Sequence, residues 1–217
     1  STNKVYGDNP NKLPLIEEKN RWEIKNTHKY KSGIDENMAI DNCTHSFFGV
    51  SKSYADLIVQ EYGKNIGLKT VCFRAGCITG PNHSGARLHG FLSYLVKTCL
   101  KKRKYTLIGY KGKQVRDNIH SIDLVNCFWE FYKKPRKGEI YNIGGGRFSN
   151  CSILEALSMV EILANIKIKK NILKENRVGD HIWYISNMKK FKKHYPRWKQ
   201  IYSTKKIINQ LIKEFSS

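Results

Sequence analysis

The spacing of apolar residues in this chain switches repeatedly between the period of a helix and that of a strand. In residues 44–67, apolar and aromatic positions recur near the helical period, and the pattern ends at Gly63 or Gly67. These positions are Phe47, Val50, Tyr54, Leu57, Ile58 and Tyr62. Residues 68–76 are β-branched and apolar, which predicts a buried strand, and the turn-forming residues 79–85 follow it.

The same alternation continues towards the C-terminus. Helices are predicted at residues 89–102, 121–134, 151–166 and 204–215, strands at 105–110 and 138–146, and a loop at 111–118. Asn150 or Ser152 is placed to cap the helix over 151–166. Residues 9–44 are polar, with weak periodicity, and predict a long, partly irregular connection of the kind that often lines an active site. Strands separated by helices predict an α/β fold.

The net charge of +21 invites an interpretation as a nucleic-acid-binding protein. However, the lysines are spread over almost every segment, and the sequence contains no zinc finger, RNP motif or recognition helix with an aromatic stacking platform. We therefore expect a solvated basic surface, part of which faces a phosphate-bearing ligand, and no specific nucleic-acid partner.

The six cysteines show no CxxC pair and no Cys/His ligand spacing, which argues against a zinc site. Several lie in apolar patterns, where cysteine acts as a small apolar residue, and they indicate a reducing, cytoplasmic compartment. No apolar run approaches the ~20 residues of a membrane span, and the first residues lack a signal-peptide layout. Because the chain begins in what reads as the end of a strand, we expect it to be a fragment of a longer protein.

Several motifs occur in a fixed order: STNKVYGD, FGVSK, FRAGCITGP and QVRDNIHSIDL, followed by YNIGGG and NRVGDH. Together they resemble the extended short-chain dehydrogenase/reductase family, in particular its NAD-dependent nucleotide-sugar epimerases and dehydratases. The resemblance covers nearly the whole chain. The fuller runs TGPNHSG, LHGFL and GDHIWY look most like the branch that epimerises C2 of a CDP-linked 3,6-dideoxyhexose.

This resemblance implies the C-terminal part of an extended short-chain dehydrogenase Rossmann fold, with its last parallel strands, and a small α/β substrate-binding domain. Residues 1–80 would belong to the NAD-binding domain and carry the catalytic helix. Residues 81–217 would mainly bind the nucleotide sugar. YNIGGG comes too late to be the dinucleotide fingerprint, which follows the first strand of a βαβ unit, so the fingerprint half is expected upstream of Ser1. A homodimer or higher homo-oligomer is also compatible with the family.

The catalytic residues of the family map onto Thr2, Phe48 and Lys52. A Ser or Thr at the position of Thr2 hydrogen-bonds the substrate hydroxyl or keto oxygen. A Tyr and a Lys four residues apart then face the cofactor from one helix. Lys52 matches the lysine that anchors the nicotinamide ribose, but Phe48 stands where the Tyr is expected. A phenyl ring transfers no proton, and general acid–base help is worth about 100- to 10,000-fold in rate.

Three explanations for Phe48 stay open at this point. The protein binds its substrate but is chemically weak, or another group replaces the tyrosine hydroxyl, or this branch allows Phe and uses Thr2 with a bound water. The candidate replacements are Tyr6, His45, Cys77 and His83. Cys77 is also expected near the nicotinamide, although a buried structural thiol is an equally good interpretation.

Two arginines, Arg116 and Arg177, are predicted to bind the diphosphate of the substrate, because guanidinium groups bind phosphate oxygens through paired hydrogen bonds. By resemblance, Asp117 and Asp180 would orient the neighbouring loops. The walls of the nucleotide site would include His89, Phe91 and Tyr105. The predicted function is NAD-dependent epimerisation of a nucleotide sugar, with a CDP-sugar favoured, through transient oxidation to a keto sugar. A 4-epimerase, a 4,6-dehydratase and a non-catalytic binding protein are the alternatives.

Overall fold

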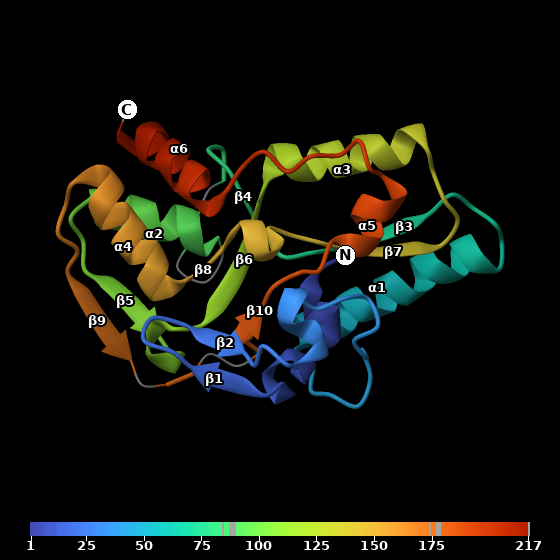
Figure 1. Ribbon diagram of the computed structural model, residues 1–217, viewed down its shortest axis with the longest axis horizontal. Coiled ribbons are helices and arrows are strands. Elements are labelled where there is room, and N and C mark those ends of the chain that lie inside the picture. The colour runs from blue at the N-terminus through green and yellow to red at the C-terminus, as the bar shows by residue number, and fades with distance from the viewer. Residues whose placement is uncertain (84, 87–89, 174, 177–178, 217) are drawn as a thin grey trace.

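The computed structural model describes residues 1–83, 85–86, 90–173, 175–176 and 179–216 (Figure 1). Its α-helices are α1 (Phe47–Lys64), α2 (Phe91–Leu100), α3 (Ser121–Lys133), α4 (Ile153–Ala164), α5 (Lys189–His194) and α6 (Thr204–Ser216). Its strands are β1 (Leu15–Glu17), β2 (Trp22–Ile24), β3 (Val71–Ala75), β4 (Cys77–Thr79), β5 (Tyr105–Ile108), β6 (Val115–His120), β7 (Glu139–Ile143), β8 (Asn150–Ser152), β9 (Lys170–Leu173) and β10 (Trp183–Tyr184). Short 3-10 helices include η1 (Asn3–Tyr6) and η2 (Asn9–Lys12). The predicted α/β fold is thus confirmed.

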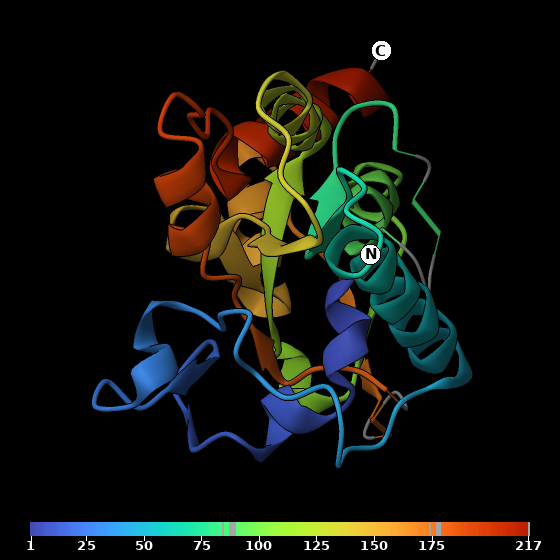
Figure 2. The same cartoon turned by 90° about the vertical axis from the view of Figure 1, so that its right-hand side faces the viewer.

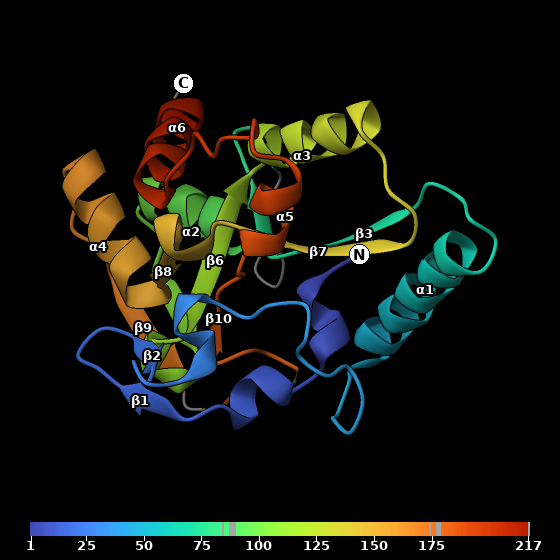
Figure 3. The same ribbon diagram turned by 45° about the vertical axis from the view of Figure 1, so that its right-hand side comes forward.

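The parallel strands β3 and β7 lie between α1 and α3 (Figures 1 and 3). Side chains alternate along β3, so Cys72 and Arg74 face α1, whereas Phe73 packs among aromatic rings of α3 and α5. Thr2 forms an isolated parallel bridge with Ala75, beside the end of β3. The backbone of Thr2 is extended at this point, directly before η1.

A second sheet is built around β6, in the order β10-β6-β4, and β8 also pairs with β6. The strands β4 and β10 run parallel to β6, and β8 runs antiparallel to it. Beside these strands, α2, α4 and α6 pack together around an apolar core (Figure 1). The helix α4 begins at Ser152, whose side chain and that of Glu155 form a capping box, as expected for this position.

The central strand β6 begins at Val115, within the segment 111–118 where the sequence predicted a loop, so that prediction was wrong for residues 115–118. Its sequence VRDNIH is polar, which is typical of loops, yet Asp117 and His120 are almost fully buried. Hydrogen bonds offset part of the cost of this burial: Asp117 accepts from the backbone N–H of the distant Ser186 at 2.8 Å, and His120 Nδ1 accepts from the N–H of Ile122, two residues further on, at 3.1 Å. Tertiary contacts have overridden the local pattern.

Other differences from the prediction come from very short strands. The polar connection over residues 9–44 contains the antiparallel hairpin of β1 and β2. The strands β4, β8 and β10 have only two or three residues each, too few to show an alternating pattern. Thr79, expected among the turn residues, ends β4. The predicted helices and longer strands are all confirmed, with bounds that differ by a few residues.

The helix α1 packs with the face opposite to the one that its apolar pattern indicates. The side chains of Phe47 and Tyr54 are 99% and 69% exposed, and the other apolar positions of the stripe are also exposed. Small and polar residues face the sheet instead: Gly49, Asp56, Gln60 and Gly63. Exposed apolar faces of this kind commonly contact another polypeptide. The homo-oligomer expected from the sequence stays a prediction.

An ion pair under α1 explains this orientation. Asp56 and Arg74 are paired at 2.8 Å, with side chains 0% and 3% exposed. Gln60 donates to the same carboxylate at 2.7 Å, and Arg74 donates to the hydroxyl of Tyr6 at 3.1 Å, which in turn donates to Asn142 at 2.7 Å. Although burial opposes it, hydrogen bonding from Arg74 holds the pKa of Asp56 below its usual value. The network ties η1, α1, β3 and β7 together.

Replacing Asp56 should therefore destabilise the folded protein. We expect Asp56→Ala to lower the free energy of unfolding by about 3–5 kcal/mol, because the guanidinium of Arg74 would stay buried without its partner. Denaturant-induced unfolding measures this loss. The control is Glu61→Ala, an exposed carboxylate on the same helix, for which we expect a change within about 0.5 kcal/mol. Similar losses in both variants would contradict the special role of the buried pair.

All six cysteines are unpaired thiols, and four of them are buried. Their packing inside strands and helices agrees with the apolar role predicted for them. Within the described ranges, none of the helices is both long enough and apolar enough to cross a membrane.

Candidate active site

Thr2 stands at the entrance of η1. Its hydroxyl oxygen accepts from the backbone N–H of Lys4 at 3.3 Å and caps this turn. The turn η1 packs beside α1 (Figure 2). Gly49 permits this approach, since a Cβ at that position would lie 3.0 Å from the carbonyl oxygen of Lys4. The first turn of α1 is thereby fixed next to Thr2.

Phe48 and Lys52 project from the same side of α1, as their spacing predicted. The ammonium nitrogen of Lys52 lies 5.6 Å from the centre of the Phe48 ring, and both side chains are exposed. Such a cation–π contact is worth about 0.5–1 kcal/mol at an exposed site. The pair therefore presents a cation and an apolar ring, without the hydroxyl that proton transfer requires.

Arg116, at the start of β6, reaches the segment that follows residue 178. One of its terminal nitrogens, Nη1, donates to the carbonyl oxygen of His181 at 2.5 Å, and Nη2 pairs with the carboxylate of Asp180 at 2.6 Å. From the other end of the chain, the ammonium of Lys4 lies 4.0 Å from the second carboxylate oxygen of Asp180 and donates to the carbonyl oxygen of Gly179 at 2.8 Å. Two cations thus flank one carboxylate.

The backbone around Asp180 is held by residues of the polar connection. The amide group of Asn11 donates to the carbonyl oxygen of Asp180 at 2.9 Å and accepts from the N–H of Ile182 at 2.7 Å. The ring of His181 is buried, which lowers its pKa well below the usual value, and its Nε2 lies 2.8 Å from the carbonyl oxygen of Gly7. This neutral ring donates to Gly7 and fixes the segment further.

Cys77, at the start of β4, lies within electrostatic reach of Arg116, Asp117, Lys4 and Asp180. Burial raises the pKa of its thiol to about 11, although the charge of Arg116 opposes the shift. The thiol is therefore protonated at neutral pH and is a poor replacement for the missing tyrosine as a base. Cys77 pairs with Asn118, two residues after Arg116 on β6, so the structure brings Cys77 and Arg116 close together. Their roles at a nicotinamide and at a diphosphate stay predictions.

The other candidates for proton transfer differ in their surroundings. Tyr6 is completely buried in the network below α1, and burial raises its pKa to about 12, so it serves as a structural residue. His45 precedes α1 directly, with Nε2 2.8 Å from the carbonyl oxygen of Val5. His83 lies beyond β4, with Nδ1 3.4 Å from the hydroxyl of Ser93. A catalytic role for His45 or His83 stays a prediction.

Two of the residues expected to form the nucleotide wall, Phe91 and Tyr105, belong to the apolar core around α2. Tyr105 is 6% exposed and lies in the core around α2, where its ring centre is 6.0 Å from that of Tyr94. Phe91 is partly buried against the same core. Most of the surface of Tyr105 is thus used for packing, and the nucleotide contacts stay predictions. His89 and Arg177 lie outside the described residues.

Asp117 points into the joint between the two sheets. Its carboxylate accepts from the backbone N–H groups of Ser186 at 2.8 Å and Gly146 at 3.3 Å. Gly76 and Gly144 must be glycines here, because a Cβ at either position would lie 2.2 or 2.0 Å from the carboxylate oxygens. Burial raises the pKa of Asp117 to about 6. The Gly-Gly-Gly turn therefore packs around a carboxylate, in agreement with the prediction that it is no dinucleotide fingerprint.

This shift of the Asp117 pKa predicts a pH-dependent stability. The folded-state value of about 6 exceeds the value of about 3.9 in an unfolded chain. The stabilisation linked to the proton is therefore complete below pH ~4 and is lost as the pH rises through ~6. Between pH 4 and pH 7, we expect the wild type to lose about 2 kcal/mol more unfolding free energy than Asp117→Asn.

Denaturant-induced unfolding at both pH values tests this expectation. The control is Asp41→Asn, an exposed carboxylate, which should follow the pH profile of the wild type. If Asp117→Asn also keeps the wild-type profile, the carboxylate of Asp117 is already ionised in the folded protein at pH 4.

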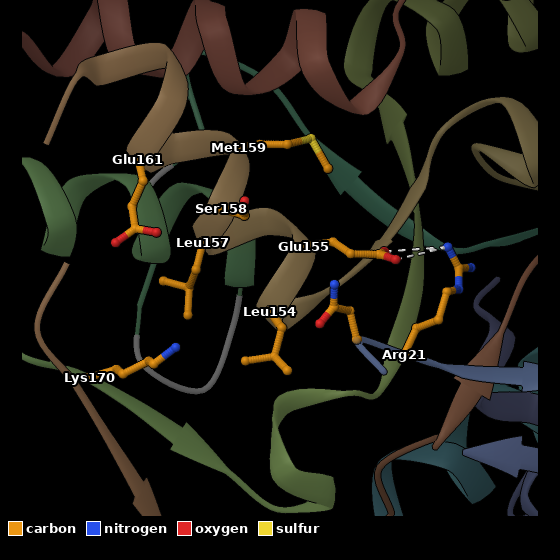
Figure 4. Close-up of a pocket in the computed structure, with 9 residues that line it drawn as sticks. Arg21, Leu154, Glu155, Leu157, Ser158, Met159, Glu161 and Lys170 are labelled. Carbon is orange, nitrogen blue, oxygen red and sulfur yellow. Dashed lines mark hydrogen bonds and ion pairs between the residues drawn. The ribbon is translucent and has the colours of Figure 1, made fainter. Parts of the chain in front are cut away.

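A pocket of about 490 Å³ lies away from this cluster, between α4, β9 and the turn that joins β1 to β2 (Figure 4). Its lining consists of Asn20, Arg21, Leu154, Glu155, Leu157, Ser158, Met159, Glu161 and Lys170. Arg21 is paired with Glu155 at 3.3 Å across its rim. Since none of the predicted site residues lines it, we do not assign the active site to this pocket. Among the described residues, no three His, Cys, Asp or Glu side chains are grouped so as to hold a metal ion.

Two residues that build the cluster, Lys4 and Asn11, were not predicted from the sequence. Lys4 stands two positions after Thr2 within STNKVYGD, and this proximity was the available signal. Asn11 carries no comparable signal, because the backbone groups that it holds are 169 and 171 residues away.

Comparison with known proteins adds the following. A model of the NAD dependent epimerase/dehydratase family matches residues 1–144. The CDP-paratose 2-epimerase of Salmonella typhi is 31% identical over 199 residues, which cover 88% of this chain and 56% of that protein. The dTDP-glucose 4,6-dehydratase 1 of Escherichia coli K12 is 25% identical over 187 residues, covering 86% and 46%. The structure of the UDP-glucuronic acid 4-epimerase of Bacillus cereus, in complex with UDP-glucuronic acid and NAD, has a TM-score of 0.75 at 22% identity and covers 100% and 60%. This chain thus spans about half of these proteins.

Proposed function

This chain belongs to the NAD dependent epimerase/dehydratase family, and we propose that it serves NAD-dependent epimerisation of a nucleotide-linked sugar, specifically the conversion of CDP-paratose to CDP-tyvelose. One observation carries the proposal: the Lys4–Asp180 contact joins the turn that carries Thr2 to Arg116 on β6, and Cys77 on the neighbouring strand β4 interacts with the same charges. The 31% identity to a CDP-paratose 2-epimerase supports this substrate.

The residues present fit the nicotinamide end of NAD. Lys52 offers an exposed cation on α1, next to the turn that carries Thr2, and a cation at this place can hold the ribose hydroxyls. When bound, NAD accepts a hydride from the sugar and returns it. The GxGxxG fingerprint does not occur in the sequence. We therefore propose that these 217 residues supply only part of the NAD site.

The other groups act on the substrate. The hydroxyl of Thr2 can accept from a sugar alcohol and donate to the keto oxygen that replaces it, so it serves both directions of the oxidation. Arg116 would hold the diphosphate, with Arg177 as the second proposed ligand. While the diphosphate stays bound, the keto sugar turns, so that hydride returns to its other face and the configuration at carbon is inverted.

The chemistry of the cluster supports an epimerase over a dehydratase. Loss of water needs a base that removes a proton from carbon and an acid that protonates the leaving hydroxyl, in addition to the oxidation. Here burial raises the pKa of the Cys77 thiol to about 11, so this group beside the cluster stays protonated and is a poor base. Epimerisation through a keto sugar needs only one proton shuttle, at the oxidised hydroxyl.

Phe48 favours a second candidate, a protein that binds the nucleotide sugar without turning it over. The phenyl ring and Lys52 preserve the shape and charge of the site, whereas proton transfer is lost. Both candidates bind the nucleotide sugar, but only the epimerase converts it.

The test is Phe48→Tyr, assayed for turnover of CDP-paratose with NAD by NMR of the sugar C2 proton. If the missing hydroxyl limits the rate, we expect turnover to rise by about 100- to 10,000-fold. The matched control is Phe47→Tyr, which adds the same hydroxyl one position earlier, on a side chain 99% exposed, and should change nothing. Measurable wild-type turnover that Phe48→Tyr leaves unaltered would mean that another group transfers the proton. Binding of both NAD and the nucleotide sugar without turnover in either protein would establish the second candidate.

A further inference from the structure

A chain of polar groups runs between the proposed contact for the sugar and the proposed contact for the diphosphate. Thr2 and Lys4 belong to the same turn and are joined by the hydrogen bond from the Lys4 N–H to the Thr2 hydroxyl at 3.3 Å. The ammonium of Lys4 then meets the carboxylate of Asp180, which pairs with Arg116. Lys4 thus stands between the two ends of the substrate.

We infer that Lys4 is a third cation of the substrate site, and that Asp180 occupies the position of the sugar-proximal phosphate until the nucleotide sugar displaces its side chain. This inference rests on the proposed function. The side chains of Lys4, Arg116 and Asp180 are 30%, 11% and 17% exposed, so a ligand can reach them. A diphosphate carries more charge than a carboxylate and offers more acceptor oxygens to the same two cations.

The hydrogen bonds of Arg116 show that it does not need Asp180 for its orientation. Its Nη1 donates to the carbonyl oxygens of Val115 at 2.9 Å and His181 at 2.5 Å, and only Nη2 engages Asp180. When the carboxylate turns away, two backbone acceptors still hold the guanidinium plane, and Nη2 becomes available to a phosphate oxygen. Lys4 likewise keeps its bond to the carbonyl oxygen of Gly179 at 2.8 Å.

The backbone of Asp180 need not move in this exchange. Asn11 bonds to the carbonyl oxygen of Asp180 and to the N–H of Ile182, which fixes the chain on both sides of His181. A rotation of the Asp180 side chain is therefore sufficient. The two cations are already in place, and the carboxylate of Asp180 offsets part of their charge until the ligand arrives.

Calorimetric binding of CDP and of inorganic pyrophosphate tests this arrangement. We expect Lys4→Met to weaken binding of both about tenfold, the loss of one charge-assisted hydrogen bond, and Lys4→Arg to retain it. Asp180→Asn should strengthen binding about fivefold, because the internal competitor is gone while Arg116 keeps its orientation. The control is Lys12→Met, which removes the same charge from an exposed ion pair with Asp8 (3.2 Å) outside the cluster. This variant should leave binding within twofold.

The outcomes separate the inference from the function on which it rests. If the wild type binds CDP but Asp180→Asn weakens binding, Asp180 orients the site and the inference is wrong. If Lys4→Met and Lys12→Met behave alike, Lys4 does not contact the ligand, and the inference is again wrong while the proposed function stands. If the wild type binds neither CDP nor pyrophosphate, both fall. Thermal unfolding of each variant confirms that it is folded.

Discussion

The buried carboxylate of Asp117 is the contact on which the arrangement of the two sheets depends. It lies between Gly76, which follows β3, and Gly144, which follows β7, and it accepts from the N–H of Ser186 just after β10. One side chain of β6 therefore joins the ends of the first sheet to the second. Because side chains alternate along a strand, burial of Asp117 on one side directs Arg116 to the other. The position of the cationic cluster relative to Thr2 follows from this joint.

The longer elements of the fold could be predicted from the sequence, because their periodicity is a property of the segment alone. For α1, however, periodicity indicates that one face is apolar without showing which face meets the sheet. Here the buried pair of Asp56 and Arg74 and the small residues Gly49 and Gly63 decide the orientation, and the apolar stripe remains outside. Which face of α1 packs against the sheet therefore depends on the segments that contact it, and the sequence of α1 alone does not show it. The strand β6 was missed for a similar reason, since the groups that satisfy its polar residues lie elsewhere in the chain.

In the candidate site, too, local motifs could be recognised from the sequence, whereas long-range contacts could not. Motifs indicated Thr2, Phe48, Lys52, Cys77 and Arg116, and the structure places Cys77 and Arg116 close together, with Thr2 on the turn beside α1. The contribution of the polar connection could not be read from its composition, since Asn11 and Gly7 act through hydrogen bonds to residues about 170 positions away. Local patterns report on local geometry. A site assembled by such long-range contacts becomes visible only when the fold is known.

The distribution of charge clarifies what the excess of lysine does. The buried or nearly buried ion pairs of the described residues use arginine, as in Arg74 with Asp56 and Arg116 with Asp180. A guanidinium group keeps several donors in a fixed plane, so it can satisfy a carboxylate and backbone carbonyls at once. Most lysines instead lie on the surface, where their charges are screened by salt. Lys4 differs from them because its ammonium is held at the cluster by Gly179 and Asp180.

Phe48 takes no part in the contacts that hold Arg116 in the cationic cluster. Lys52 lies over the phenyl ring, Gly49 still allows α1 to approach η1, and the hydrogen bonds around Arg116 involve no atom of α1. The elements proposed to bind the diphosphate are therefore mechanically independent of the residue that would transfer the proton. Binding and proton transfer can be separated in such a site, because one depends on the joint at Asp117 and the other on a single hydroxyl group. This separation explains how a chain that lacks the tyrosine hydroxyl keeps the cationic cluster of Lys4 and Arg116 around Asp180.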